Sequence, residues 1–339
     1  MRAGLLLVAL SAQADMSALL AQAESKGYQA YVRVEVHGVP VYERGLGLAN
    51  RALNVPWSGQ TVVDIGSIVK PMAQLALWDL VVKGRLSTSD TLGKYLPLRG
   101  NKAALPIDLV MKHRAGLPDI FGDDYEPMTR EGLLEKINQC KLVYPPGKGY
   151  LYSNSGYSLL AMVIERITNG KFEDELRKVE FGPADCPSIG YIRPRWSRRM
   201  LTHGYELGGE DWGSPLDHFW FYDGPGWNLR GNGGMLSTMS DLAKWARAVG
   251  TPGKVFSQKL LGLWLPNVYG PSAKPGSGWA FAGGNGYFDT VAYFNQSLDL
   301  TVVMASNVKH REIEDFGSQI FKLARQMASP EHPGIKSED

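Results

Sequence analysis

A serine and a lysine three residues apart are the first pair in this chain whose types and spacing could do chemistry. Ser67 and Lys70 lie in the stretch Asp64-Ile65-Gly66-Ser67-Ile68-Val69-Lys70-Pro71-Met72. In a helix this spacing places both side chains on one face, within reach of each other. A lysine takes the proton of a serine hydroxyl when burial lowers the lysine pKa. Ser-x-x-Lys alone is equally compatible with a capping serine and an exposed lysine.

The neighbouring residues predict that this serine stands at a strand-to-helix corner. Thr61-Val62-Val63 is typical of a short strand, and residues 73–82 are apolar and helix-forming. Pro71 fits only in a first helical turn, so the helix is expected to start near Ser67. The free N–H groups of a helix start are suited to stabilise an oxyanion.

A tyrosine and an asparagine that suit the same chemistry follow a rigid turn. Residues 145–157 read Pro-Pro-Gly-Lys-Gly-Tyr-Leu-Tyr-Ser-Asn-Ser-Gly-Tyr and precede a helical pattern over 158–167. The hydroxyl of Tyr152 is suited to move a proton between the serine, the lysine and a leaving group. Asn154 offers a donor and an acceptor that could hold the lysine and a substrate amide.

The elements that must position these residues are strands at both ends of the chain and helices in the middle. Alternating apolar residues predict strands over 30–36, 39–42, 278–282, 287–294 and 300–305. Helical periodicity predicts helices over 107–111, 131–137, 157–167, 172–179 and 312–327, and a helix over 238–249 that Thr238 caps.

This order predicts an α/β (α+β) fold, in which terminal helices flank an antiparallel sheet and an all-helical lobe is inserted. We expect one bilobed domain over residues 15–339, with an α/β lobe of about 15–68 and 270–330 and a helical lobe of about 69–269. Ser67 then lies at the seam between the lobes, where small-molecule sites are common. The aromatic-rich segment 194–232 is either a lid or pocket wall or a separate hydrophobic cluster.

Composition narrows the class of partner. The 339 residues are 44% hydrophobic and 21% charged, with a net charge of +2 and no basic block, which disfavours nucleic acid as a partner. A small molecule or a peptide is the expected substrate, and the oligomeric state stays open. No cofactor or metal is expected, because Cys140 and Cys186 lack metal-ligand spacing; they form either a disulfide or two independent thiols.

The N-terminus suggests export. Residues 1–14 resemble a signal peptide with an Ala-x-Ala site before Asp15, which predicts a periplasmic or secreted protein. The alternative is an apolar N-terminal helix, or a leader of which only part is present. No later segment is long and apolar enough to span a membrane.

Ser67-x-x-Lys70 followed by Tyr152-Ser153-Asn154 resembles the penicillin-recognising serine hydrolases. The resemblance is to the class C β-lactamase-related group, which includes D-alanyl-D-alanine carboxypeptidases, D-aminopeptidases and esterases. It runs in order from about Val32 to Asn307 and includes three further stretches: His113-Arg114-Ala115-Gly116-Leu117-Pro118, Pro146-Gly147 and Gly233-Gly234-Met235-Leu236-Ser237-Thr238.

The resemblance implies a β-lactamase/transpeptidase-like fold and a role for each matching residue. Ser67 is implied to be the acylated nucleophile, Lys70 its base and Tyr152 the second proton-transfer group. Asn154 is implied to contact Lys70 and the acyl side chain. His113 is expected to be structural, and Ser237, Thr238 and Asp241 to cap a helix.

The third motif of this group departs from the pattern. Relatives carry Lys-Thr-Gly or His-x-Gly on a strand that lines the cleft, whereas this chain has Phe281-Ala282-Gly283-Gly284-Asn285-Gly286. Phe281 is expected on the opposite wall of the pocket, where a base would favour carboxylate-bearing substrates. The backbone at Gly283 and Gly284 is expected to complete an oxyanion hole with the Ser67 N–H. Lys274-Pro275-Gly276 fits Lys-x-Gly only by letter, in a Pro/Gly loop.

Two functions are compatible with these residues. The first is a serine hydrolase that forms an acyl-enzyme on Ser67 with a small ester, amide or D-amino-acid peptide, esterase-like or peptidase-like rather than a β-lactamase. The second is a non-catalytic binding homologue that lost turnover together with the base of the third motif. Retention of Ser67, Lys70, Tyr152 and Asn154 favours the first.

Overall fold

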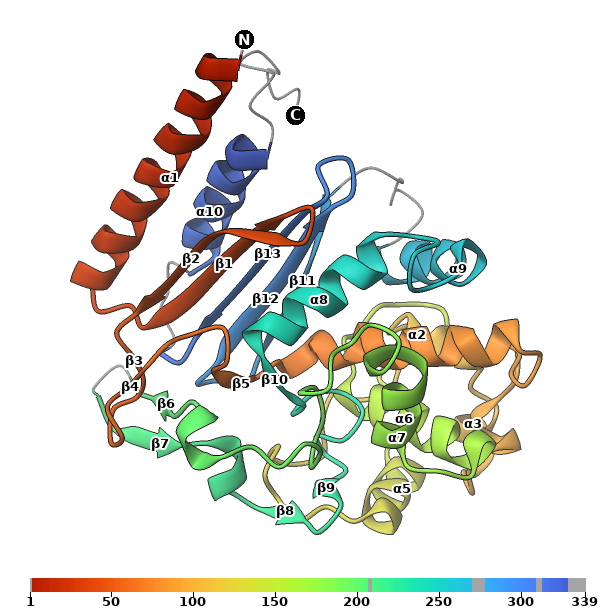
Figure 1. Cartoon of the computed structure of the whole chain (residues 1–339). Helices are drawn as coiled ribbons and strands as arrows, with labels where there is room; N and C mark the ends of the chain where they lie inside the picture. The colour runs from red at the N-terminus through yellow and green to blue at the C-terminus, as the bar shows by residue number, and fades with distance from the viewer. Residues whose placement is uncertain (1, 207–208, 270–277, 309–312, 329–339) are drawn as a thin grey trace.

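A five-stranded antiparallel sheet organises the computed structural model, which describes residues 2–206, 209–269, 278–308 and 313–328 (Figure 1). The strand order is β11-β12-β13-β1-β2. The strands are β1 (Ala30–Val36), β2 (Val39–Leu46), β11 (Gly278–Gly284), β12 (Asp289–Asn295) and β13 (Leu300–Ser306). Ala30 of β1 lies opposite Ser306 of β13, so the two ends of the chain form one sheet. The predicted fold class is confirmed.

The β1–β2 hairpin follows from its turn residues. His37 and Gly38 both have positive φ angles, 55° and 75°, as a two-residue turn that matches the twist of the strands requires. β1 is buried along most of its length, and it lies inside the sheet between β13 and β2.

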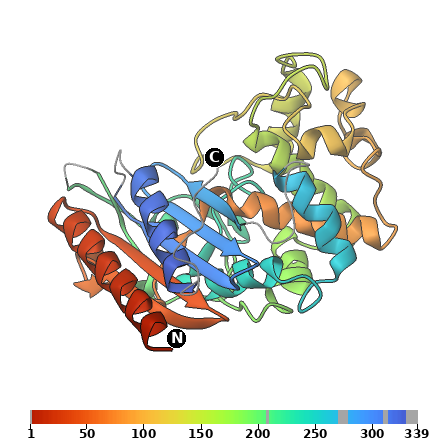
Figure 2. The same cartoon turned by 90° about the horizontal axis from the view of Figure 1, so that it is seen from above.

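Two helices cover one face of the sheet, side by side (Figure 2). They are α1 (Arg2–Ser25) and α10 (Ile313–Ala328). Met16 and Leu20 of α1 and Ile320 of α10 are fully buried in this layer. α1 is continuous through the site predicted for signal-peptide cleavage before Asp15, and that cleavage stays a prediction.

Helices from the middle of the chain form a separate region beside the sheet (Figures 1 and 2). They are α2 (Val69–Val82), α3 (Gly100–Ala103), α4 (Ile107–Met111), α5 (Arg130–Gln139), α6 (Asn154–Thr168) and α7 (Phe172–Leu176), with α9 (Gln258–Tyr269) packed against α2. The helix predicted over 172–179 is divided, because the chain continues from α7 as a π-helix over Arg177–Phe181.

α8 (Met239–Gly250) packs on the face of the sheet opposite α1 and α10. Thr238 caps it by accepting a hydrogen bond from the Asp241 N–H at 3.2 Å, as the sequence predicts. The ring of Trp245 lies 5.4 Å from that of Phe281 on β11. The sequence assigned α8 to the helical lobe, whereas its amphipathic face is buried against the sheet.

Short strands connect these layers. They are β3 (Leu48–Asn50), β4 (Val55–Pro56), β5 (Val62–Asp64), β6 (Gly204–Tyr205), β7 (Asp211–Gly213), β8 (Trp220–Phe221), β9 (Gly224–Pro225) and β10 (Leu236–Thr238). The pair β5–β10 matters most for the site, because β5 leads directly into Ser67.

The two cysteines are separate thiols. Cys140 donates to the carbonyl of Ile137 and the buried Cys186 donates to that of Ala184. Across the described ranges, no helix combines the length and apolarity that crossing a bilayer requires.

Candidate active site

Ser67 lies in the short 3-10 turn Gly66–Ile68, which joins β5 to α2 and packs against β11 and β12. Gly66 has a φ angle of 48°, and a side chain there would collide with the backbone of Gly283 and Gly284. A Cβ on Gly283 would in turn lie 2.6 Å from the Ser67 nitrogen. Both glycines are required because two backbones meet here without intervening side chains.

The structure brings Lys70 and Tyr152 to the same oxygen. Lys70 Nζ donates to Ser67 Oγ at 2.9 Å, and the Tyr152 hydroxyl donates to it at 2.7 Å. The Lys70 side chain crosses the face of the Tyr152 ring, with Nζ 4.7 Å from the ring centre. Tyr152 arrives from the loop before α6, 85 residues away along the chain.

Burial sets the protonation of these two groups. Lys70 is only 4% exposed, and desolvation lowers its pKa to about 7 against the opposing charges of Asp119 and Asp124. Desolvation raises the pKa of Tyr152 to about 12, although its hydrogen bond to Ser67 opposes the rise. Near neutral pH Lys70 is therefore the group that exchanges a proton, and Tyr152 stays protonated.

Asn232 makes the contact with Lys70 that the sequence analysis expected of Asn154. The second hydrogen bond from Lys70 Nζ goes to the carbonyl of Asn232 at 2.7 Å. Within the described part of the chain, Lys70 and Asn154 form no hydrogen bond with each other. Asn154 is instead the first residue of α6, and its N–H donates to Asp119 Oδ1 at 2.9 Å. Nothing in the sequence pattern marks the Asn232 carbonyl, because any residue supplies one.

His113 holds Tyr152 in place. Its ring stacks on that of Tyr152 with centroids 4.6 Å apart, and its Nδ1 accepts the Ser153 N–H at 3.0 Å. Burial, and next the charge of Lys70, lower the pKa of His113 to about 4. The ring is therefore neutral at pH 7 and carries its proton on Nε2, which fits a positioning role.

The N–H of Gly284 points toward Ser67. Opposed pairs in an antiparallel ladder alternate between hydrogen-bonded and non-hydrogen-bonded. The Asn285 N–H donates to the carbonyl of Phe288, so these two residues form a hydrogen-bonded pair. The next pair, Gly284 and Asp289, is therefore a non-hydrogen-bonded pair. Since β11 is the edge strand, the Gly284 N–H faces away from β12, toward the turn that carries Ser67.

Phe281 does not line the cleft, contrary to the sequence-based expectation. Side chains alternate along β11, and the one of Phe281 faces the core, 6% exposed, against Trp245, Trp264 and Tyr269. Ala280 and Ala282 face the cleft instead. Lys274, which fits the Lys-x-Gly pattern of the third motif in sequence, lies outside the described residues.

Asp64 and Asn285 were not predicted as site residues, yet they join its two halves. Asp64 Oδ1 accepts the Gly66 N–H at 2.7 Å, and Oδ2 accepts from the Asn285 side-chain amide at 3.0 Å. Asn285 Oδ1 in turn accepts the N–H groups of Tyr287 and Phe288. Burial raises the pKa of Asp64 to about 7.

The aromatic segment 194–232 packs beside this turn. Trp212 stacks on Tyr287, with centroids 4.4 Å apart, and on His218, with centroids 3.8 Å apart. Tyr222 is 90% exposed on the surface. Trp212 therefore supports the β11–β12 turn, and the described residues that line the cavity beside Ser67 belong to other segments.

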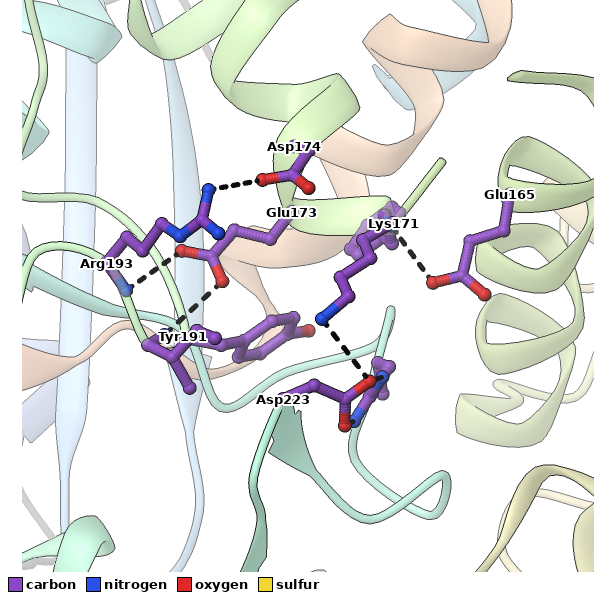
Figure 3. A pocket seen from close by; sticks show the side chains of 10 residues that line it. Glu165, Lys171, Glu173, Asp174, Tyr191, Arg193 and Asp223 are labelled. Atoms are coloured by element: carbon purple, nitrogen blue, oxygen red, sulfur yellow. Dashed lines mark hydrogen bonds and ion pairs between the residues drawn. The ribbon is translucent and has the colours of Figure 1, made fainter. Parts of the chain in front are cut away.

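A charged cluster around α7 is a second candidate, but its charges satisfy one another (Figure 3). Arg230 pairs with Asp223 at 2.9 Å and Arg193 with Asp174 at 3.1 Å. Glu173 accepts the backbone N–H of Arg193 at 3.2 Å. The remaining void is about 10 Å³, near the minimum for one water molecule, so the cluster is structural.

The fold and the sequence together define the class of protein. Residues 20–320 match the family model described as Beta-lactamase, and the chain belongs to this family. Family and fold place it among the penicillin-recognising serine hydrolases and indicate a serine hydrolase of the β-lactamase and penicillin-binding-protein type.

Individual relatives are distant. The chain is 24% identical over 310 residues to "Putative penicillin-binding protein PbpX" of Bacillus subtilis (strain 168), covering 88% of this chain and 76% of that protein. It spans about half the length of other curated relatives, 49% and 44% in two cases.

Solved structures share the fold over nearly the whole chain. The penicillin-binding protein from Bacillus halodurans has a TM-score of 0.74 at 21% identity, covering 90% of this chain and 99% of that one. The β-lactamase/D-alanine carboxypeptidase from Pseudomonas syringae has a TM-score of 0.73 at 19% identity, covering 94% of this chain and 100% of that one.

Proposed function

We propose that this protein hydrolyses a neutral ester or small amide through an acyl-enzyme on Ser67. It is then esterase-like or peptidase-like rather than a true β-lactamase, and D-amino-acid peptides remain within its substrate class. One observation carries the proposal: Lys70 Nζ and the Tyr152 hydroxyl both lie within hydrogen-bonding distance of Ser67 Oγ.

The first step is attack by Ser67 on the substrate carbonyl. In the neutral form of Lys70, Nζ accepts the Ser67 proton while an Oγ–C bond forms. The Ser67 and Gly284 N–H groups stabilise the oxyanion. The bond to the alcohol or amine then breaks, and Tyr152 donates a proton to the leaving group and recovers one from Lys70.

The second step is hydrolysis of the acyl-enzyme. Water adds to the acyl carbon, the bond to Ser67 Oγ breaks, and Oγ recovers a proton as the carboxylic acid leaves. Neutral Lys70 takes the proton of the water, directly or through the Tyr152 hydroxyl, which passes its own proton to Lys70 as it accepts the one from water. Asn154, half-buried beside Tyr152, is proposed to contact the acyl side chain.

The preference for a neutral substrate rests on the wall of the cleft. Among the described residues that line it, none is lysine, arginine or histidine, and Asp289 is acidic. A carboxylate, as in a β-lactam or a peptide C-terminus, would find no opposite charge on this wall.

Covalent labelling tests the proposal. A fluorophosphonate probe should add mass to the peptide that contains Ser67. Ser67→Ala should abolish labelling, and Lys70→Ala should slow ester turnover roughly a hundredfold or more. Ser89→Ala and Lys83→Ala are matched controls, because both residues are exposed beyond the C-terminal end of α2.

Labelling at another residue, or full activity in both site variants, would contradict the proposal. Binding of an ester without labelling or turnover would instead support the non-catalytic homologue.

A further inference from the structure

A cavity of about 480 Å³ begins at Ser67 and Tyr152 and continues along the sheet toward α10. Its floor is a row of cross-strand neighbours, each directly opposite the next. The row runs from the edge strand inward: Ala282, Val291, Met304 and Val32. Its side chains point to one face of the sheet, because opposed residues in a ladder share a face.

The roof of the cavity comes from α10, which lies over this face of the sheet (Figure 2). Phe316, Gly317 and Phe321 line it from the helix, and the Phe316 ring packs against Tyr28 with centroids 5.4 Å apart. The cavity is therefore a groove between a helix and a sheet, with the nucleophile at its β11 end.

The polar side chains along the groove are few and mostly engaged within the protein. Thr290 donates to the carbonyl of Asp64 at 2.9 Å, and Ser306 lies within hydrogen-bonding distance of the carbonyls of Gln29 and Val308. Among the described lining residues, Asp289 is the carboxylic acid, and Tyr28 and Tyr152 are phenols. A polar or anionic occupant would lose hydration here without gaining partners.

We propose that this groove binds a hydrocarbon chain of the substrate, so that the protein acts on neutral esters with a medium-length or longer aliphatic chain. The inference rests on the proposed function, because the groove opens on the same Ser67. Its physical basis is removal of apolar surface from water, which is proportional to chain length until the groove is filled. The chain belongs either to the acyl group or to the alcohol of the ester.

Two substrate series show whether the acyl group or the alcohol of the ester carries the hydrocarbon chain that binds in the groove. The first varies the acyl group of p-nitrophenyl esters from acetate to decanoate, and the second varies the alcohol of acetate esters over the same lengths. In one series kcat/KM should rise about fourfold for each methylene that is buried. A flat profile in both series, with acetate turned over and Ser67 labelled, would overturn the inference and leave the proposed function intact.

Two variants test whether the hydrocarbon chain of the substrate binds in this groove. Ala280→Leu fills space at the exposed face of β11 without touching the core, and should reduce the ratio of octanoate to acetate kcat/KM by about tenfold or more. Val291→Thr keeps the volume and adds a hydroxyl to the floor, which should flatten the same profile. Ala104→Leu, on the exposed end of α3, is the matched control and should keep the wild-type profile.

A binding measurement separates the groove from catalysis. Calorimetry with Ser67→Ala should show 1-octanol binding more tightly than 1-butanol, and adding Ala280→Leu should remove that difference. If ester turnover is absent but this difference is present, the proposed function fails and the groove assignment stands. If neither alcohol binds, or if Ala280→Leu leaves the difference unchanged, the groove assignment is wrong.

Discussion

Lys70 shows how a single buried residue acquires its chemistry. A lysine on the surface is protonated at neutral pH and has no lone pair to accept a proton. Here the amine lies over the face of the Tyr152 ring, and it donates to the Ser67 hydroxyl and the Asn232 carbonyl. Desolvation therefore outweighs the more distant carboxylates, and the pKa falls to about 7.

This pKa predicts the pH dependence of the reaction. In the proposed mechanism the neutral form of Lys70 is the base, so kcat/KM should rise with pH and reach half its plateau near pH 7. Tyr152 should not cause a decline below pH 9, because its pKa is raised to about 12. The measurement is kcat/KM for a neutral ester between pH 5 and pH 9.

Lys70→Arg is the control, since a guanidinium retains its charge and does not give up a proton in this range. Its activity should fall roughly a hundredfold to ten-thousandfold at every pH. A wild-type profile that is flat from pH 5 to pH 9 would show that Lys70 is not the titrating base.

Two elements distant in sequence must meet to make the proposed oxyanion hole. The turn before α2 carries the Ser67 N–H, and the end of β11 carries the Gly284 N–H. The buried side chain of Asp64 accepts a hydrogen bond from the Gly66 N–H in the turn that carries Ser67. It accepts another from the side chain of Asn285, which follows the end of β11. This contact sets the distance between the two donors, and Asn285 is therefore a positioning residue.

Asn285→Ala should slow acylation by displacing the Gly284 N–H. Loss of a whole oxyanion donor costs about a hundredfold to a thousandfold, so a displaced one should cost about tenfold, in kcat rather than in KM. The measurement is steady-state kinetics together with the rate of fluorophosphonate labelling, at a temperature where both proteins are fully folded.

The exposed Asn101 on α3 provides the matched control, and Asn101→Ala should leave both rates unchanged. If Asn285→Ala lowers only the melting temperature and leaves kcat intact, Asn285 serves stability alone.

The whole molecule depends on closing the sheet from both ends of the chain. β1 pairs with β13 across more than 260 residues, and this pairing is covered by α1 and α10. The loop-closure entropy is large, so burial of the terminal helices must offset it. The α1–α10 layer is thus a determinant of stability that lies on the far side of the sheet from α8.

Leu20→Ala in α1 should lower the free energy of unfolding by about 2 to 5 kcal/mol, because the side chain is fully buried. Chemical denaturation of the full chain measures this value. Leu10→Ala is the matched control on the same helix: Leu10 is 54% exposed, and its loss should change stability by no more than about 0.5 kcal/mol. Equal effects of the two substitutions would contradict the packing of α1 on the sheet.

Much of the architecture could be predicted because it depends on local patterns. Alternation over 30–36 and 300–305 marked two strands that pair with each other, and helical periodicity marked α4 at its observed bounds. Ser67 and Lys70 could be paired by spacing alone, since one helical turn brings them together without help from the rest of the fold.

What only the tertiary structure decided involves contacts between distant segments and the choice between two faces. The Asn232 carbonyl is 162 residues from Lys70, and Asn285 is 221 residues from Asp64. No periodicity marks such contacts, because they arise when elements pack. Alternation in β11 predicts that Phe281 and Ala282 face opposite sides, but the sequence does not show which side is the cleft; burial among Trp245, Trp264 and Tyr269 places Phe281 in the core.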